Sequence, residues 1–257
     1  MDKSSFGGVV LALGGILAGM MIEGGSLRQI MQPTAAMIVL GGTIGAVLLQ
    51  FPLQTVIGAV KQLARVFFSK EQDGTAVVIQ LVEFANKARR SGIVSLDADL
   101  GNVHEPFLKQ ALMLAVDGTE PAELRKIMQL ELDNQGETEE RIPQVFESAG
   151  GYSPTVGIIG AVLGLIQVMQ HLDNIDEVGR GIAVAFVATI YGVGFANLFC
   201  LPSAGKLKIR HREEQMQKEM MLEGVISIME GMNPRMVELK LKTYLGEHQP
   251  APEAVKV

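Results

Sequence analysis

Residues that could carry catalysis are scattered along this 257-residue sequence, and none of them forms a recognisable catalytic motif. The serine-hydrolase, zinc-protease and phosphate-loop signatures are absent, and no two histidines stand at a metal-ligand spacing. The histidines are His104, His171, His211 and His248. The single cysteine, Cys200, excludes a disulfide framework and a multi-cysteine zinc site, and we interpret it as a small apolar residue. The sequence therefore predicts no enzyme, no metal and no cofactor.

A second group of polar residues and prolines lies within two long apolar stretches. These residues are Ser153, Pro154, Thr155 and Gln167 in one stretch and Thr189, Tyr191, Asn197 and Pro202 in the other. Neither stretch contains Asp, Glu, Lys or Arg, whereas proteins that move ions across a membrane keep an ionisable group there. If this chain moves an ion, the carboxylate must therefore come from a partner chain.

These polar residues also have a structural interpretation. The hydroxyls of Thr155 and Thr189 would simply bond to helix carbonyls. Pro154 would open one helix, where a missing N–H costs nothing, and Pro202 would lie near the end of another. Residue types alone leave both interpretations open.

The elements that hold these residues are four stretches without charged side chains. The first lies between Lys3 and Glu23 and the second between Arg28 and Lys61, and the other two run from Ser148 to Leu172 and from Gly181 to Gly205. A helix of about 20 residues crosses the roughly 30 Å hydrocarbon core of a bilayer. We therefore predict four membrane spans, at residues 4–22, 33–52, 150–171 and 180–203.

The charge-free stretches have two alternative interpretations. Four buried helices of a soluble protein would need a large amphipathic shell, which a chain of this length cannot supply. The first stretch also resembles a secretory signal peptide with Lys3 as its basic region, but no A-x-A-like site follows it and a second span comes soon after. The overall composition, with only 19% charged residues against about 25% in soluble domains, favours the membrane.

The basic residues near the span ends predict the orientation. Several follow the second and fourth spans, whereas the short links between paired spans contain only Arg28 and Arg180. Because cytoplasmic loops carry the excess of Lys and Arg, both termini and the middle segment are expected in the cytoplasm. The predicted fold is an all-α polytopic membrane protein with a helical cytoplasmic domain at 53–147, a helical cytoplasmic tail at 204–245 and a disordered C-terminus at 246–257.

The middle segment carries most of the negative charge, with 10 basic and 15 acidic residues across positions 61–147. Thr119 and Thr138 are predicted to cap helices there, and Asn233-Pro234 is predicted to end the helix of the tail. The net charge of −6 and the absence of a basic run argue against a nucleic-acid partner.

Glycine pairs spaced by four residues mark three of the spans. They are Gly15 and Gly19, Gly41 and Gly45, and Gly160 and Gly164. In lipid such pairs let helix backbones approach closely. We therefore expect the spans to pack against other helices, in this chain or in further copies of it.

Three segments together resemble one family. Residues 149–166, AGGYSPTVGIIGAVLGLI, are similar to the third span of MotA/PomA-type flagellar motor stator subunits, which belong to the MotA/TolQ/ExbB proton channel superfamily. Residues 183–202, AVAFVATIYGVGFANLFCLP, resemble the fourth span, although Gly194 stands where a larger apolar residue is usual. Residues 88–97, ARRSGIVSLD, resemble a cytoplasmic patch of the family in which Asp97 replaces the usual Glu.

The resemblance implies a mechanism. Family members form a ring, expected to be a pentamer, in the bacterial inner membrane around two copies of a single-span B subunit that carries the membrane Asp and grips peptidoglycan. Ion passage past that Asp drives rotation. Pro154, Thr155, Ala161, Thr189 and Pro202 would line the ion path. Sodium-driven members tend to have a Thr in place of Ala161, so its lack of a hydroxyl favours protons.

The resemblance also implies a contact with the rotor. Arg89, Arg90 and Asp97 would meet oppositely charged residues of a switch-complex protein; by spacing alone they form a solvated helix face. Two other functions stay open at this point, a TolQ/ExbB-like energiser of an envelope process and a membrane scaffold without ion flux. The energisers usually have one span before the large loop, and this chain has two predicted.

Overall fold

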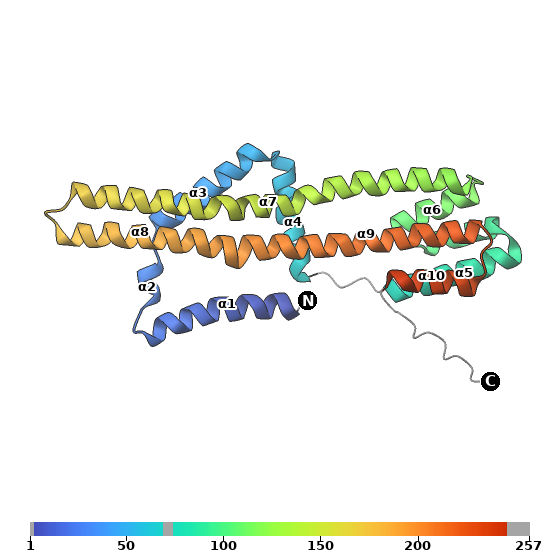
Figure 1. The fold of residues 1–257 in the computed structure, drawn as a ribbon, viewed down its shortest axis with the longest axis horizontal. Coiled ribbons are helices and arrows are strands. Elements are labelled where there is room, and N and C mark those ends of the chain that lie inside the picture. Colours follow the sequence, from blue (N-terminus) through green and yellow to red (C-terminus); the bar gives the residue numbers. More distant parts are fainter. Residues whose placement is uncertain (1–2, 69–73, 246–257) are drawn as a thin grey trace, which may run out of the picture. The chain divides into compact units, whose positions relative to one another are not determined.

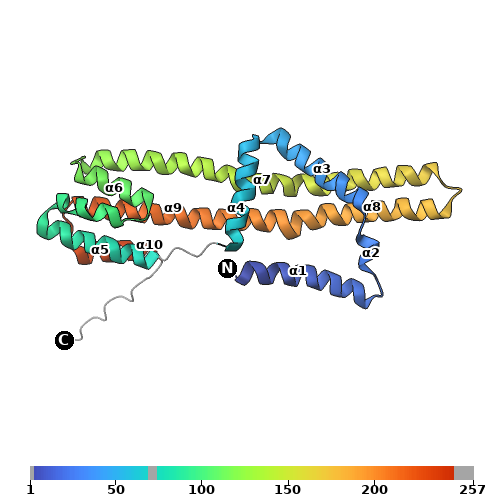
Figure 2. The same ribbon diagram turned by 180° about the vertical axis from the view of Figure 1, so that it is seen from behind.

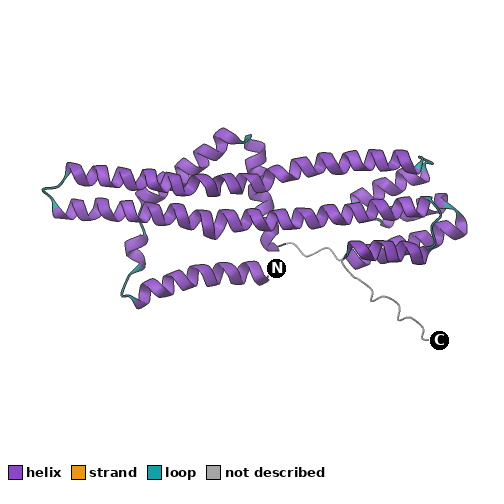
Figure 3. Cartoon of the chain, viewed as in Figure 1, coloured by secondary structure: helices purple, strands orange, loops and turns teal. Residues whose placement is uncertain are grey.

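The computed structural model describes residues 3–68 and 74–245, and within these ranges the regular structure is helical (Figure 3). The predicted disordered C-terminus, 246–257, lies outside the described residues. The chain divides into two compact units, of which the first contains residues 1–70 and 139–209 and the second contains residues 71–138 and 210–257. The helices α7 (Pro121–Gln170) and α9 (Leu201–Met229) contribute residues to both units.

The first unit is built from the apolar stretches of the sequence. Its other elements are α1 (Lys3–Ile22), α2 (Leu27–Ile30), α3 (Pro33–Gln50), α4 (Leu53–Phe68), α8 (Ile175–Phe195) and the π-helical segment η2 (Ala196–Cys200). Figure 1 shows α7 and α8 running side by side with α3 beside them. Among the described residues, three helical segments are long and apolar enough to cross a membrane: Pro33–Gln50, part of Pro121–Gln170 and part of Ile175–Met229. The apolar helix Phe6–Ile22 is shorter.

The structure corrects the predicted positions of two prolines. Pro154 does not open a helix, because α7 runs unbroken from Pro121 to Gln170 with Pro143 and Pro154 inside it. Pro202 does not lie near a helix end, because helix continues from Ile175 to Met229. Each proline removes one backbone donor, and helices tolerate this loss where packing against a neighbour holds them together.

One predicted helix cap is also wrong. Thr138 lies within α7, and its hydroxyl donates to the carbonyl of Asn134, 3.0 Å away and one turn back. The threonine followed by two glutamates therefore does not mark a helix start here, because α7 begins before this threonine and the threonine lies in its interior. Asn233, in contrast, caps α10 (Pro234–Tyr244), accepting a hydrogen bond from the Arg235 amide.

The second unit combines the middle segment with the tail around one apolar core. Its elements are α5 (Gly74–Ser91), the 3-10 helix η1 (Ile93–Asn102), α6 (Pro106–Val116), α10 and the adjoining parts of α7 and α9 (Figure 2). The core is lined by fully buried side chains from these helices, among them Leu81, Leu108, Leu124, Met220 and Leu241. Residues 78–132 of the predicted cytoplasmic domain and residues 220–241 of the predicted tail thus share a core.

Glu223 of α9 joins three helices of this unit. Its carboxylate accepts hydrogen bonds from Arg125 of α7, at 2.8 Å, and from Lys240 of α10. Burial would raise the pKa of Glu223, but the hydrogen bonds and charges of Lys240 and Arg125 outweigh it and hold the pKa below its ordinary value. The Glu223 carboxylate is therefore ionised at neutral pH and links the three helices of the second unit through charged hydrogen bonds.

Candidate functional site

The helices α7 and α8 meet along a seam of small residues. A Cβ atom placed on Gly192 would lie only 2.6 Å from the carbonyl oxygen of Ser153, and one on Gly164 would lie 2.8 Å from the carbonyl oxygen of Gly181. A Cβ atom on Gly160 would lie 2.8 Å from the Cβ of Ala188. The two backbones are therefore as close as glycine allows, which is how helices associate in a membrane.

The glycines of the sequence-predicted pairs fall into two groups. Gly160 and Gly164 lie in this seam. At the others, Gly15, Gly19, Gly41 and Gly45, a Cβ would meet nothing within 4 Å in the described part of the chain. Sequence reasoning missed several seam residues, although small residues recur every three to four positions: Ser153 and Gly157 in α7, and Gly181, Ala185, Ala188 and Gly192 in α8.

Helix α3 covers one side of this two-helix layer. Ile38 lies against Gly160, and Gly42 lies so close to Val156 that a Cβ there would be 2.7 Å from its Cγ1. Val39 of α3 and Ala188 of α8 belong to one buried cluster. Successive residues of a helix are turned by about 100° around its axis. Residues at a large angle from those that contact α3 therefore lie on other sides of α7 and α8.

Three of the predicted ion-path residues lie on the side of the layer that α3 does not cover. Pro154 and Ala161 are turned about 120–140° around α7 from the residues that contact α3, and Thr189 is turned by a similar angle around α8. We call this the uncovered side. Pro154 is also next to the seam, 3.3 Å from a Cβ placed on Gly192, one turn along from Thr189. Pro154 therefore lies across the seam from Gly192, which is one helical turn from Thr189.

The remaining two predicted residues lie apart from these three. Thr155 is exposed at the outer edge of α7, and its hydroxyl donates to the carbonyl of Tyr152 at 2.7 Å. Pro202 is thirteen residues beyond Thr189, about 20 Å along the helix. The hydroxyl of Thr189 donates to the carbonyl of Ala185 at 3.2 Å, as the structural interpretation expects, and its lone pairs stay available as acceptors.

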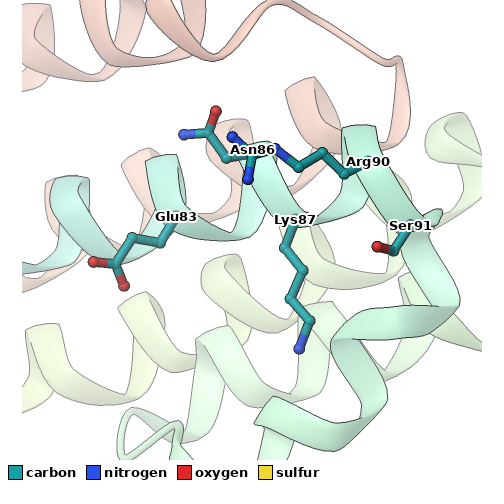
Figure 4. A pocket seen from close by; sticks show the side chains of 5 residues that line it. All are labelled: Glu83, Asn86, Lys87, Arg90 and Ser91. Carbon is teal, nitrogen blue, oxygen red and sulfur yellow. The ribbon is translucent and has the colours of Figure 1, made fainter.

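The predicted rotor-contact residues lie on the second unit. Arg89 and Arg90 at the end of α5 and Asp97 in η1 are all exposed. Nearby, Lys87 pairs with Asp99 at 2.6 Å. A cavity of about 510 Å³ is lined by Glu83, Asn86, Lys87, Arg90 and Ser91. In Figure 4 the Arg90 side chain lies along α5 toward Asn86, while Lys87 points away from both; Arg90 lines this cavity, and Arg89 and Asp97 do not.

Comparison with known proteins decides among the functions that the sequence left open. Residues 6–92 match the model described as motility protein A N-terminal, and residues 100–220 match the MotA/TolQ/ExbB proton channel family. The curated motility protein A of Bacillus subtilis (strain 168) is 38% identical over 95% of this chain and 91% of its own length. The chain belongs to the MotA/TolQ/ExbB proton channel family.

Solved structures place it within the motility branch of that family. The structure of C. jejuni MotAB is 31% identical and matches with a TM-score of 0.91, over 97% of this chain and 98% of the other. The flagellar MotAB stator complex of Bacillus subtilis is 38% identical and matches with a TM-score of 0.87, over 95% and 96%. The resemblance read from the sequence is confirmed: this family member is a flagellar stator subunit and not an enzyme.

Proposed function

We propose that this stator subunit, together with a single-span B subunit anchored to peptidoglycan, forms a proton-conducting unit that turns ion flow into torque on the rotor. The observation that carries the proposal is the uncovered side, which holds Pro154, Ala161 and Thr189 but lies within spans that contain no carboxylate. A proton path needs a group that binds and releases the ion, so the Asp must be supplied by the partner. The MotAB complexes that match this chain support such a partner.

The proposed topology has four spans, with both termini in the cytoplasm and the second unit as a cytoplasmic head. The spans are those of the sequence, 4–22, 33–52, 150–171 and 180–203. The clustering of Lys and Arg after the second and fourth spans supports the orientation in the bacterial inner membrane. Helix α1 supports the first span by its length of 20 residues.

The proposed assembly is a ring of several copies, by family resemblance a pentamer. Gly15 and Gly19 on α1, and Gly41 and Gly45 on α3, offer close-packing faces that no described residue of the same chain fills. In lipid such faces gain stability only when another helix occupies them. A neighbouring copy or the B subunit is the partner we propose for them.

Within this assembly the ion path is proposed to pass Pro154, Thr155, Ala161, Thr189 and Pro202. Ala161 offers no hydroxyl to help coordinate Na⁺, which supports protons as the driving ion. On the cytoplasmic head, the exposed charges of Arg89, Arg90 and Asp97 are proposed to meet the rotor protein of the switch complex.

Deletion of the gene followed by a swimming assay tests the proposed function. We expect cells without the chain to keep their flagella but to stop swimming, and expression of the full chain with its B subunit to restore motility and proton conduction. Membrane localisation is measured in parallel. Normal swimming after deletion in a cell with no second stator set would contradict the proposal.

A further inference from the structure

The carbonyl group of Asn197 lacks its normal helix partner. In the π-helical segment Ala196–Cys200 the hydrogen bonds reach back five residues, and the Leu201 amide donates to the carbonyl of Ala196. That amide is the donor that an α-helix would give to Asn197. The donor that a π-helix would give belongs to residue 202, which is a proline and has no N–H. Because of the π-helical segment, the missing N–H of Pro202 leaves the main-chain carbonyl of Asn197 without a donor.

The side chain of Asn197 adds a second acceptor at the same place. Its amide nitrogen donates to the carbonyl of Val193 at 3.0 Å. Because a carbonyl can only accept, this bond fixes the amide with Oδ1 facing away from the helix. Oδ1 has no donor among the residues that the structure describes, and the Asn197 side chain is exposed.

The packing of Phe195 and Phe199 shows on which side of the helix the Asn197 side chain is exposed. The rings of Phe195 and Phe199 stack with centroids 5.4 Å apart, and Phe195 packs against the buried cluster that contains Ala149 and Cys200. Asn197 lies between them in sequence and so projects away from that cluster. Unsatisfied carbonyl oxygens at membrane depth are costly unless they line a wet cavity or bind an ion.

We propose that the main-chain and side-chain carbonyl oxygens of Asn197 form a binding site for the hydrated proton on the cytoplasmic side of Thr189. Oxygen dipoles freed where a helix is interrupted are the groups that replace an ion's water in membrane proteins. Asn197 is eight residues beyond Thr189, about 12 Å along the helix, and precedes the cationic Lys206. The inference rests on the proposed proton path and assigns to it an exit site that contains no ionisable group.

Two substitutions eliminate the two free acceptors separately. Asn197→Leu removes Oδ1, and Pro202→Ala restores an N–H that can occupy the main-chain carbonyl of Asn197 while leaving its side chain in place. Each is expressed as the full chain with its B subunit, and proton flux into inner-membrane vesicles is followed with a pH-sensitive dye at a clamped potential. We expect each to lower the flux about tenfold, the effect of losing one well-placed hydrogen bond, with the amount of membrane protein unchanged.

Conservative variants separate this role from packing. Asn197→Gln keeps an amide oxygen and should retain most of the flux, and Ile190→Leu, on an exposed position two turns away, should match wild type. Wild-type flux in Asn197→Leu, or in Pro202→Ala, would refute the proposed binding site at the two oxygens of Asn197 while leaving the proposed function intact. If Asn197→Leu fails to insert, Pro202→Ala decides alone. A wild-type complex that neither conducts protons nor restores swimming would refute the proposed function itself.

Discussion

At Gly192 the nearest obstacle to a side chain is a backbone atom, the carbonyl oxygen of Ser153, at 2.6 Å. Gly192→Ala would force α7 and α8 apart, and we expect it to destabilise their pairing by about 1–3 kcal/mol, as overpacking usually does. The measurement is the thermal unfolding midpoint of the detergent-solubilised complex, together with the amount of chain in the membrane.

Gly194 provides the matched control for this substitution. It lies two residues further on the same helix, and a Cβ there meets nothing within 4 Å in the described chain. Gly194→Ala should therefore leave the unfolding midpoint unchanged. Equal destabilisation by both variants would show that helix α8 is sensitive to alanine in general and that the seam is not the cause.

The exposed arginines of α5 carry a prediction about torque. Arg90→Glu reverses a charge that lines the cavity together with Glu83 and Lys87, and we expect a severe loss of swimming speed at normal protein level. Lys109→Glu, another exposed charge reversal on the second unit, should swim as wild type. Loss of the protein from the membrane in Arg90→Glu would instead mark Arg90 as structural.

At the scale of the elements, Glu223 shows how the second unit is held together. Glu223→Gln removes the negative charge that both Arg125 and Lys240 contact. We expect it to destabilise this unit by about 2 kcal/mol, because charged hydrogen bonds are lost. Glu213→Gln, an exposed site on the same helix, should have little effect. Hydrogen exchange of α9 and α10 amides measures both.

The same carboxylate gives a pH dependence with a definite sign. Because the folded pKa of Glu223 lies below its ordinary value of 4.5, its stabilisation is fully present above that value and is lost as the pH falls through the folded pKa. The difference between wild type and Glu223→Gln should therefore be constant at neutral pH and shrink in acid. A difference that grew on acidification would contradict the assignment.

Several features of these elements could be predicted from the sequence, and others could not. The apolar stretches and the break at Asn233 were readable because hydrophobicity and capping are local properties. The helical positions of Pro154 and Thr138 were not, because packing of α7 on its neighbours overrides the local tendency to end or begin a helix. The π segment also has no local signature, since nothing before Pro202 distinguishes it from α-helix.

At the scale of the whole chain, the family resemblance found in the sequence is confirmed by relatives that cover nearly its full length. The joint core of the middle segment and tail was not predictable, because it pairs residues that are far apart in the sequence, as Arg125 and Glu223, 98 positions apart, illustrate. The seam was readable only in part, because GxxxG pairs reveal a small face without revealing its partner.

The driving ion gives a prediction for the complete motor. Because Ala161 offers no hydroxyl, we expect swimming to persist when Na⁺ is replaced by K⁺ and to stop when a proton uncoupler collapses the gradient. Swimming speed is measured by tracking cells in both media. Speed that rises with Na⁺ and survives the uncoupler would assign the motor to sodium.

The seam also determines which of its defects a second mutation can repair. At Gly160 the obstacle is a methyl group, the Cβ of Ala188 at 2.8 Å, so Gly160→Ala should be suppressed by Ala188→Gly. At Gly164 and Gly192 the obstacle is a carbonyl oxygen, which no substitution can remove. A suppressor screen should therefore return intragenic revertants in α8 for Gly160→Ala and only true revertants for Gly192→Ala. Along this interface, genetic repair is possible only where side chains meet side chains.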